Sequence, residues 1–337
     1  MIPHSAPWIT AEDRAAVDRC LASGQIASGA LTRQFEDRVA RYVGARSARA
    51  APDGTTALSA ALREVRVGPG DEVVLPTYVC IDVERAIRAV GAEPRFADVA
   101  ADGTLTPEAV ERAVTPRTKA IIAVHTFGHI CPIAPLRTFG VAVVEDACQT
   151  FGGETPARRT GVLGDIGVYS FHATKCLTTG EGGMLVSASL DLAHDADADE
   201  APIAGLSDLQ AALGLAQLAR YDAFLARRAA IRSRYDAALD ARGTAPRSAA
   251  AHLFRFTFLL RDDTSFAAAA EHFAKRGIAV RRGVDALLHR AHGLADSDFP
   301  QSTALFARTV SVPFYPALTD EQVEQVAHAL AEYDGVA

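Results

Sequence analysis

A lysine and an aspartate stand where they can act together on one reactive group. Lys175 lies between two short apolar runs, 166–170 and 184–187, that both predict β-strands. Asp146 ends a third apolar run, 141–146, so a carboxylate and an amine are expected at one edge of a sheet. A lysine amine can form a Schiff base with an aldehyde, and a carboxylate can keep a pyridine nitrogen protonated. The pair therefore suits pyridoxal 5′-phosphate (PLP).

The phosphate of such a ligand needs backbone amides and hydroxyl groups. Gly54, Thr55 and Thr56 precede a helical stretch, and the amides at a helix start bind anions. Ser170, five residues before Lys175, adds a hydroxyl. Taken singly these signals are weak, because a Gly-Thr-Thr run is more often a plain helix cap and an aspartate at a strand end is more often a cap or a metal ligand. Their combination around one lysine is what indicates PLP.

Three more side chains are candidates for the same site. Gln149 follows Asp146 closely and is expected to reach the ring hydroxyl of the cofactor. His125 and His172 lie near predicted strand ends, where a histidine can move a proton or contact a substrate. For each histidine, a structural role with satisfied ring nitrogens is an equal alternative.

Composition argues against several other classes of protein. The chain has 337 residues, a net charge of −7 and scattered basic residues, so nucleic-acid binding has no electrostatic footprint. Five cysteines form an odd set without a C-x-x-C pair, which argues against a disulfide framework and a structural zinc site. No apolar run approaches the ~18 residues that cross a membrane, and the start lacks the segments of a secretory signal. We therefore expect a cytoplasmic protein without a bound metal.

The elements that must position the candidate residues are predicted mainly between residues 50 and 190. Short β-rich runs alternate there with helical stretches, which is the pattern of parallel strands joined by crossover helices. The runs are apolar without clean alternation, which indicates burial on both faces of the sheet. We predict an α/β large domain over residues 1–235, in which helices flank a mostly parallel sheet.

A smaller α+β domain is predicted for residues 236–337, and a long helix over 207–240 is expected to lead into it. Thr10 is the expected N-cap of an earlier helix that ends near Gly24. The elements predicted for the small domain are a strand over 253–259, a helix over 265–275, strands near Ile278 and Val310, and a closing helix that begins at a capping box of Thr319 and Gln322.

In their order along the chain, these features resemble one family, the DegT/DnrJ/EryC1/StrS group of PLP-dependent sugar aminotransferases. The resemblance spans nearly the whole chain and implies the aspartate aminotransferase fold, PLP fold type I. It is carried by short motifs in the expected order: Pro7-Trp-Ile-Thr10, Gly54-Thr-Thr-Ala-Leu58, Gly68-Pro-Gly-Asp-Glu-Val73, Thr115-Pro-Arg-Thr-Lys-Ala120, Glu145-Asp-Ala-Cys-Gln149, Ser170-Phe-His-Ala-Thr-Lys175, Gly180-Glu-Gly-Gly183 and Leu209-Gln-Ala-Ala-Leu-Gly214.

The resemblance implies a role for each candidate. Lys175 would hold the cofactor aldehyde and move the proton, Asp146 would partner the ring nitrogen, and Gln149 would lie beside the ring oxygen. The phosphate would be held by Gly54, Thr55, Thr56 and Ser170. Members take an amino group from glutamate or glutamine and deliver it to a keto-sugar, usually nucleotide-linked, in amino-sugar biosynthesis. A homodimer with active sites at the subunit interface is also implied.

The chain departs from the family pattern in its middle part. The segment 187–207 is short, and the positions of a cross-subunit asparagine and arginine fall at Ile203 and Gly205. Cys80 stands where many relatives place an aromatic residue against the cofactor ring, and a cysteine offers less contact area.

A third departure lies in the C-terminal part, where relatives often have a Pro-Leu-His substrate motif. His289 corresponds to its histidine, and Arg281 or Arg282 is a candidate for a phosphate or carboxylate of the substrate. An exposed basic turn is at least an equal alternative for both arginines. Together the departures indicate a substrate other than the commonest nucleotide sugars.

Two alternatives to transamination remain at this point. One keeps PLP but changes the reaction, as in a dehydratase or lyase acting on a sugar. The other is a non-catalytic PLP-binding partner or regulatory protein, for which the shortened segment is the only support. Lys175 favours transamination, because related dehydratases replace this lysine with histidine.

Overall fold

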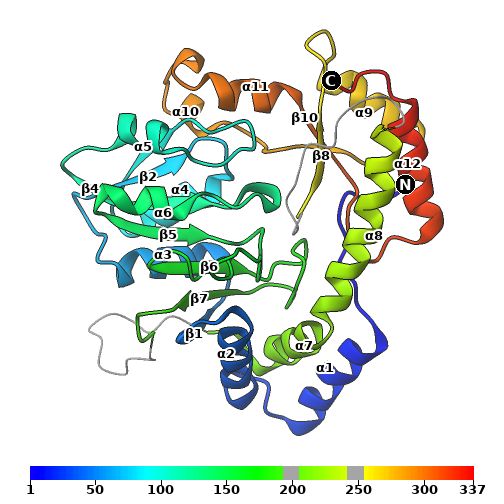
Figure 1. The fold of residues 1–337 in the computed structure, drawn as a ribbon. Coiled ribbons are helices and arrows are strands. Elements are labelled where there is room, and N and C mark those ends of the chain that lie inside the picture. Colours follow the sequence, from blue (N-terminus) through cyan, green and yellow to red (C-terminus); the bar gives the residue numbers. More distant parts are fainter. Residues whose placement is uncertain (193–204, 241–253) are drawn as a thin grey trace.

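A seven-stranded sheet forms the centre of the computed structural model, which describes residues 1–192, 205–240 and 254–337 (Figure 1). Its strand order is β1-β7-β6-β5-β4-β2-β3. The pairs from β6 to β3 are all parallel, whereas β7 runs antiparallel to both β6 and β1. The strands are β1 Ser47–Ala51, β2 Glu72–Pro76, β3 Glu93–Ala97, β4 Thr118–Val124, β5 Ala142–Asp146, β6 Ile166–Ser170 and β7 Gly183–Ser187. The mostly parallel α/β sheet predicted from the sequence is confirmed.

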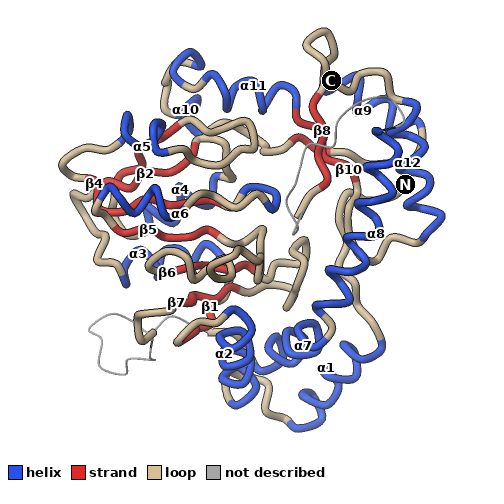
Figure 2. Tube along the Cα trace, in the orientation of Figure 1, coloured by secondary structure: helices blue, strands red, loops and turns tan. Residues whose placement is uncertain are grey.

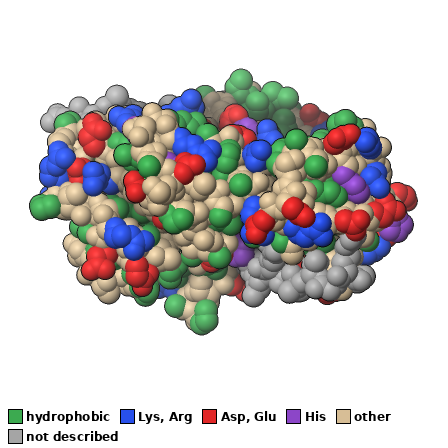
Figure 3. Space-filling view, turned by 90° about the horizontal axis from the view of Figure 1, so that it is seen from above, with side chains coloured by type: hydrophobic (Ala, Val, Ile, Leu, Met, Phe, Trp, Pro, Cys, Tyr) green, Lys and Arg blue, Asp and Glu red, His purple; other side chains and the backbone are tan. Residues whose placement is uncertain are grey.

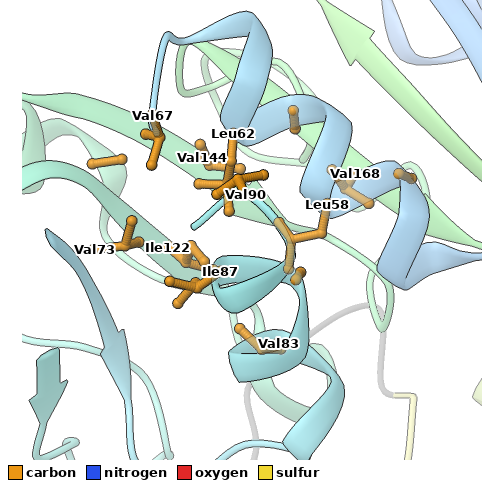
Figure 4. Packing of buried hydrophobic residues seen from close by; sticks show 14 of the residues in the cluster. Leu58, Leu62, Val67, Val73, Val83, Ile87, Val90, Ile122, Val144 and Val168 are labelled. Carbon is orange, nitrogen blue, oxygen red and sulfur yellow. The ribbon is translucent and has the colours of Figure 1, made fainter. Parts of the chain in front are cut away.

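Helices cover both faces of this sheet, as Figure 2 shows. They are α1 Ala11–Ser23, α2 Ala30–Val43, α3 Gly54–Glu64, α4 Ile81–Ala89, α5 Pro107–Ala113, α6 Ile133–Leu136, α7 Asp208–Ala219 and α8 Tyr221–Asp240, with 3₁₀ turns at Thr126–Gly128 and Arg137–Phe139. On one face, Leu62 of α3 and Ile87 of α4 lie over Ile122 and Val144 (Figure 4). On the other face, α5 and α6 cover the neighbouring strand residues, among them Val143. Successive strand residues thus enter different cores, which is why the runs lack alternation.

A second, three-stranded antiparallel sheet lies beside the first, in the order β8-β10-β9. It is formed by β8 Phe256–Leu259, β9 Arg281–Arg282 and β10 Thr309–Val312, together with α9 Phe266–Lys275, α10 Leu288–Ala291, a 3₁₀ turn Asp296–Asp298, α11 Pro300–Arg308 and α12 Asp320–Glu332. Its core includes Tyr235, Phe258, Phe273 and Val326.

One helix joins the two cores. Tyr221 and Phe224 at the start of α8 belong to the core of the large sheet, and Tyr235 near its end belongs to the second core. Ile2 also enters the second core, although the large domain is predicted to begin at residue 1. The predicted boundary between 235 and 236 falls inside α8 and stays a prediction.

Helix ends in the described parts follow their capping signals. Thr10 precedes α1, and Thr319 with Gln322 forms the predicted capping box of α12. The long helix expected over 207–240 is instead two helices, because Arg220 leaves helical geometry and donates to the Asp13 carboxylate at 2.5 Å. The strand expected near Ile278 is a single bridge to Ile2.

The exposed surface mixes charges of both signs. On the face drawn in Figure 3, Lys and Arg side chains lie interspersed with Asp and Glu. Within the described ranges, no helix combines the length and apolar character that a membrane span requires. The acidic stretch predicted as a surface loop falls mainly in 193–204, outside the described residues.

Replacing Leu62 with alanine tests the packing of α3 on the sheet. Leu62 is fully buried, so Leu62→Ala should lower the free energy of unfolding by about 2–5 kcal/mol through lost contacts and a residual cavity. Urea denaturation measures this loss. Leu21→Ala, at a leucine that is 52% exposed, is the matched control and should change stability little. Equal stability of the two variants would contradict the described core.

Candidate active site

The candidate site lies where the parallel strands of the large sheet end. Asp146 is the last residue of β5 and pairs in register with Val124 of β4 and Val168 of β6. Ser170 is the last residue of β6. These strands end toward the second sheet in Figure 1, so the site lies between the two sheets. Ligands of open parallel sheets collect at this edge, which agrees with the position expected from the sequence.

The start of α3 forms a cradle suited to a phosphate group. Asp53 caps the helix and accepts the Thr56 amide at 2.7 Å. The amides of Gly54 and Thr55 in the first turn have no acceptor within the helix. A Cβ at position 54 would lie 2.9 Å from the Cβ of Ser170, so glycine lets the helix start directly against the end of β6. The first turn of α3 and the Ser170 side chain therefore lie side by side, an arrangement that suits a phosphate.

Lys175 lies in a closed loop between β6 and β7. The fully buried Phe171 anchors this loop, because its amide donates to Gly182 and its carbonyl accepts from the Thr179 amide. Lys175 itself is half-buried, and its Nζ lies 5.1 Å from the ring centroid of Phe254 in the second part of the chain. The lysine is thus held at the boundary between the two sheets, accessible to a ligand.

The charges of Lys175 and Asp146 both act on the pKa of two thiols, Cys148 and Cys80. Burial raises the pKa of Cys148 well above its ordinary value; the Asp146 charge raises it further, and Lys175 opposes the shift. The surrounding protein raises the pKa of the Cys80 thiol by desolvation. The Asp146 charge raises this pKa further, and the Lys175 charge lowers it. The structure therefore brings the predicted lysine and aspartate into one site. Asp146 is also fixed there by the Cys148 amide, which donates to Oδ1 at 3.1 Å.

Gln149 is fixed by the main chain of a neighbouring loop. The Phe127 amide donates to Gln149 Oε1 at 2.7 Å, which leaves the Nε2 end as a donor. Phe127 has φ +55°, a left-handed conformation that a bulky residue rarely adopts. Strain of this kind is concentrated at functional sites, where surrounding contacts maintain it.

Two of the histidines predicted as substrate contacts have structural roles instead. His125 is fully buried; its Nδ1 accepts the Cys131 amide, so the proton is on Nε2, which donates to Glu145. His289 is also fully buried, with Nδ1 bonded to the Thr77 hydroxyl. Its Nε2 is bonded to Asp296 and its ring stacks on Phe299. No ring nitrogen of either histidine is left for a substrate, so the structure corrects both expectations.

The other predicted residues lie at the site but keep their roles as predictions. His172 is half-exposed in the Lys175 loop, with Nδ1 bonded to the Thr174 hydroxyl. Cys80 precedes α4, where the expected aromatic residue would lie. Arg281 lines the same pocket as Lys175. Ile203, the position of the missing cross-subunit asparagine, lies outside the described residues.

Sequence reasoning missed the most highly connected acid near the site. Glu145 is fully buried, and its two carboxylate oxygens accept from the amides of Gly161, Leu163 and Gly164 and from His125, at 2.6–2.9 Å. Its presence in an otherwise apolar strand was the available signal, because a buried acid must be paired. Across the described residues, no cluster of three or more His, Cys, Asp or Glu side chains could hold a metal ion.

Replacing His125 with alanine tests its structural role. The change leaves one buried Glu145 oxygen short of a donor, so His125→Ala should lower the free energy of unfolding by roughly 1–3 kcal/mol. The half-saturating substrate concentrations of the folded variant should be unchanged. His328→Ala, at an exposed histidine, is the control for denaturation. If the variant were fully stable but bound substrate much more weakly, the prediction that His125 contacts the substrate would be supported after all.

Comparison with known proteins identifies the family. The model of the DegT/DnrJ/EryC1/StrS aminotransferase family matches residues 7–198 and 204–331. The chain is 32% identical to the GDP-perosamine synthase of Caulobacter vibrioides, over 98% of this chain and 97% of that protein. It is 31% identical to the spore coat polysaccharide biosynthesis protein SpsC of Bacillus subtilis, over 98% and 96%.

A solved structure agrees with this result. Spr1654 from Streptococcus pneumoniae, in its PMP form, superposes with a TM-score of 0.88 at 26% identity, covering 98% of this chain and 96% of that one. Its PLP form gives 0.87. The sequence relatives and the solved structure each cover 98% of this chain. The chain belongs to the DegT/DnrJ/EryC1/StrS aminotransferase family and is a PLP-dependent aminotransferase.

Proposed function

We propose that this aminotransferase takes its amino group from L-glutamate or L-glutamine and delivers it to a keto-sugar linked to a nucleotide. The name of the Caulobacter relative, GDP-perosamine synthase, supports a nucleotide-linked amino sugar as the product. The observation that supports the chemistry is the placement of Asp146 at the end of β5 and of Lys175 in the loop after β6, where the end of β6 meets Gly54.

The residues of the cradle would hold the cofactor by its phosphate. The first-turn amides of Gly54 and Thr55 supply hydrogen bonds and the positive end of the α3 dipole, and Ser170 adds a hydroxyl. Thr56 contributes indirectly, because its amide and hydroxyl bond Asp53 and so fix the first turn. These contacts would orient the ring toward Asp146.

Asp146 and Lys175 would then act on the two ends of the reacting system. Bound PLP supplies an electron sink for the carbanion that forms when a proton leaves the substrate. Asp146 keeps a proton on the ring nitrogen, which that sink requires. Lys175 would hold the aldehyde of the cofactor and would move the substrate proton as a general base and then as a general acid. Gln149 offers its Nε2 end as a hydrogen-bond donor to the ring oxygen.

Two further expectations from the sequence remain proposals. The resemblance implies a homodimer, and light scattering of the purified protein would measure its mass. The cytoplasmic location likewise stays a prediction. Among the alternatives, a dehydratase is disfavoured by Lys175 itself, because that lysine both holds the cofactor and moves the proton.

Replacing Lys175 tests the proposed reaction. Lys175→Ala should remove the visible absorption that the lysine gives to bound PLP, and L-glutamate and L-glutamine should no longer convert the cofactor to its amine form. A loss on the order of 10²–10⁴-fold in turnover is expected from the proton transfer alone. Lys119→Ala, at an exposed lysine of β4, should behave as wild type. An unchanged spectrum in Lys175→Ala would contradict the assignment.

Replacing Ser170 tests the phosphate cradle separately from catalysis. Ser170→Ala should weaken PLP binding by about tenfold, because one hydrogen bond to a charged group is lost. It should leave binding of pyridoxal, which has no phosphate, unchanged. Ser233→Ala, at an exposed serine of α8, is the control. Equal weakening for PLP and pyridoxal would place the effect elsewhere in the site.

A further inference from the structure

The pocket beside Lys175 is lined from three separate parts of the chain. Residues 4–8 form one wall, and residues 174–176 with Thr178 form the second. The third wall comes from the second part of the chain and includes Phe254, Arg255 and Arg281. Lys175 and Arg255 approach the same ring, because the Lys175 Nζ lies 5.1 Å and the Arg255 guanidinium 5.8 Å from the centroid of Phe254.

The lining of this pocket is basic, and none of its described residues is an aspartate or glutamate. Its titratable side chains include His4, Lys175, Arg228, Arg255 and Arg281. A concave surface lined by charges of one sign attracts ions of the opposite sign. The composition of the pocket therefore indicates that its occupant carries negative charge.

Three of these residues are close enough to perturb one another. Burial lowers the pKa of His4 to about 3, and the Arg255 and Arg281 charges contribute to the shift. Burial and the Arg281 charge also lower the pKa of Arg255, while Asp285 opposes them. Within the described residues neither arginine makes an ion pair; Arg255 donates through one nitrogen to the carbonyls of Arg282 and Gly283.

Arg228 plays a different part in the same wall. Its guanidinium donates to the carbonyl oxygens of Phe314 and Phe254, and it lies 4.3 Å from the ring of Phe314. It therefore positions the aromatic residues of the wall. His4 is placed by a 2.9 Å bond between its Nε2 and the Ser311 hydroxyl.

We propose that His4, Arg255 and Arg281 form an oxyanion subsite that binds a carboxylate or phosphate group of the substrate beside Lys175. An arginine fork matches either group, and neutral histidine adds a hydrogen bond. The two sources are the carboxylate of the amino donor and the diphosphate of a nucleotide-linked acceptor. The identity of these substrates rests on the proposed function, whereas the subsite rests on the basic pocket.

Trp8 allows binding to be measured without catalysis. It is the only tryptophan of the chain and lines the same pocket. The PLP-loaded protein is titrated with glutarate, which has the carboxylates of glutamate but no amine, and separately with UDP and GDP. A saturable change in Trp8 fluorescence is expected with at least one probe.

Arg281→Gln should raise the half-saturating concentration of that probe at least tenfold, because a charge-assisted hydrogen bond contributes about 1.5–3 kcal/mol and 1.4 kcal/mol corresponds to a factor of ten. Arg281 is exposed, so the variant should fold normally. Arg255→Gln should give a comparable loss. Arg261→Gln, at an exposed arginine after β8, is the matched control and should bind as wild type.

The probes separate the two sources of the anion. A loss confined to glutarate assigns the subsite to the donor carboxylate, and a loss confined to UDP or GDP assigns it to the acceptor phosphates. Unchanged affinities in both arginine variants, or no binding of any probe to the wild-type protein, would overturn the proposal. A third outcome is also informative. If the arginine variants lose binding of a probe but the wild-type protein never reacts with glutamate or glutamine, the proposed donors are refuted and the subsite stands.

Discussion

The buried carboxylate of Glu145 fixes the strand end on which the active site depends. Four donors surround it, three from the loop at 161–164 and one from His125 after β4. Because side chains alternate along a strand, Glu145 lies on the face of Val143 and the next residue, Asp146, lies on the face of Val144. That second face is the one covered by α3. Anchoring Glu145 thus sets the direction of Asp146 toward the helix whose start is proposed to hold the phosphate.

The two parts of the fold contribute different kinds of group to the site. The large sheet and its loops supply the residues suited to the cofactor, Lys175, Asp146 and Ser170. The second sheet and the N-terminal segment supply basic residues and aromatic walls. The N-terminal segment reaches that position because the main chain of Ile2 bonds both Gly277 and Ala279. This basic part of the pocket is therefore built by contacts between residues far apart in sequence.

This division explains how much of the site could be predicted from the sequence. Asp146 lies at a strand end, Lys175 in the loop that follows a strand, and Gly54 at a helix start, where local pattern and topology fix their place. Arg255 and His4 enter the site only through the packing of the second sheet, so no local pattern marked them. The roles of His125 and His289 depended on partners such as Glu145 and Asp296, which periodicity does not place. Burial of both ring nitrogens is a property of the tertiary structure alone.

The passage of α8 through both cores has a consequence for the folding of the chain. Tyr221 and Phe224 stabilise one core and Tyr235 the other, along a single helix whose hydrogen-bond ladder connects them. Loss of either core would leave half of α8 without its apolar contacts, and short helices are marginal in water without tertiary packing. We therefore expect the two parts to unfold together, and a chain cut within α8 to yield two fragments that each lack a complete core.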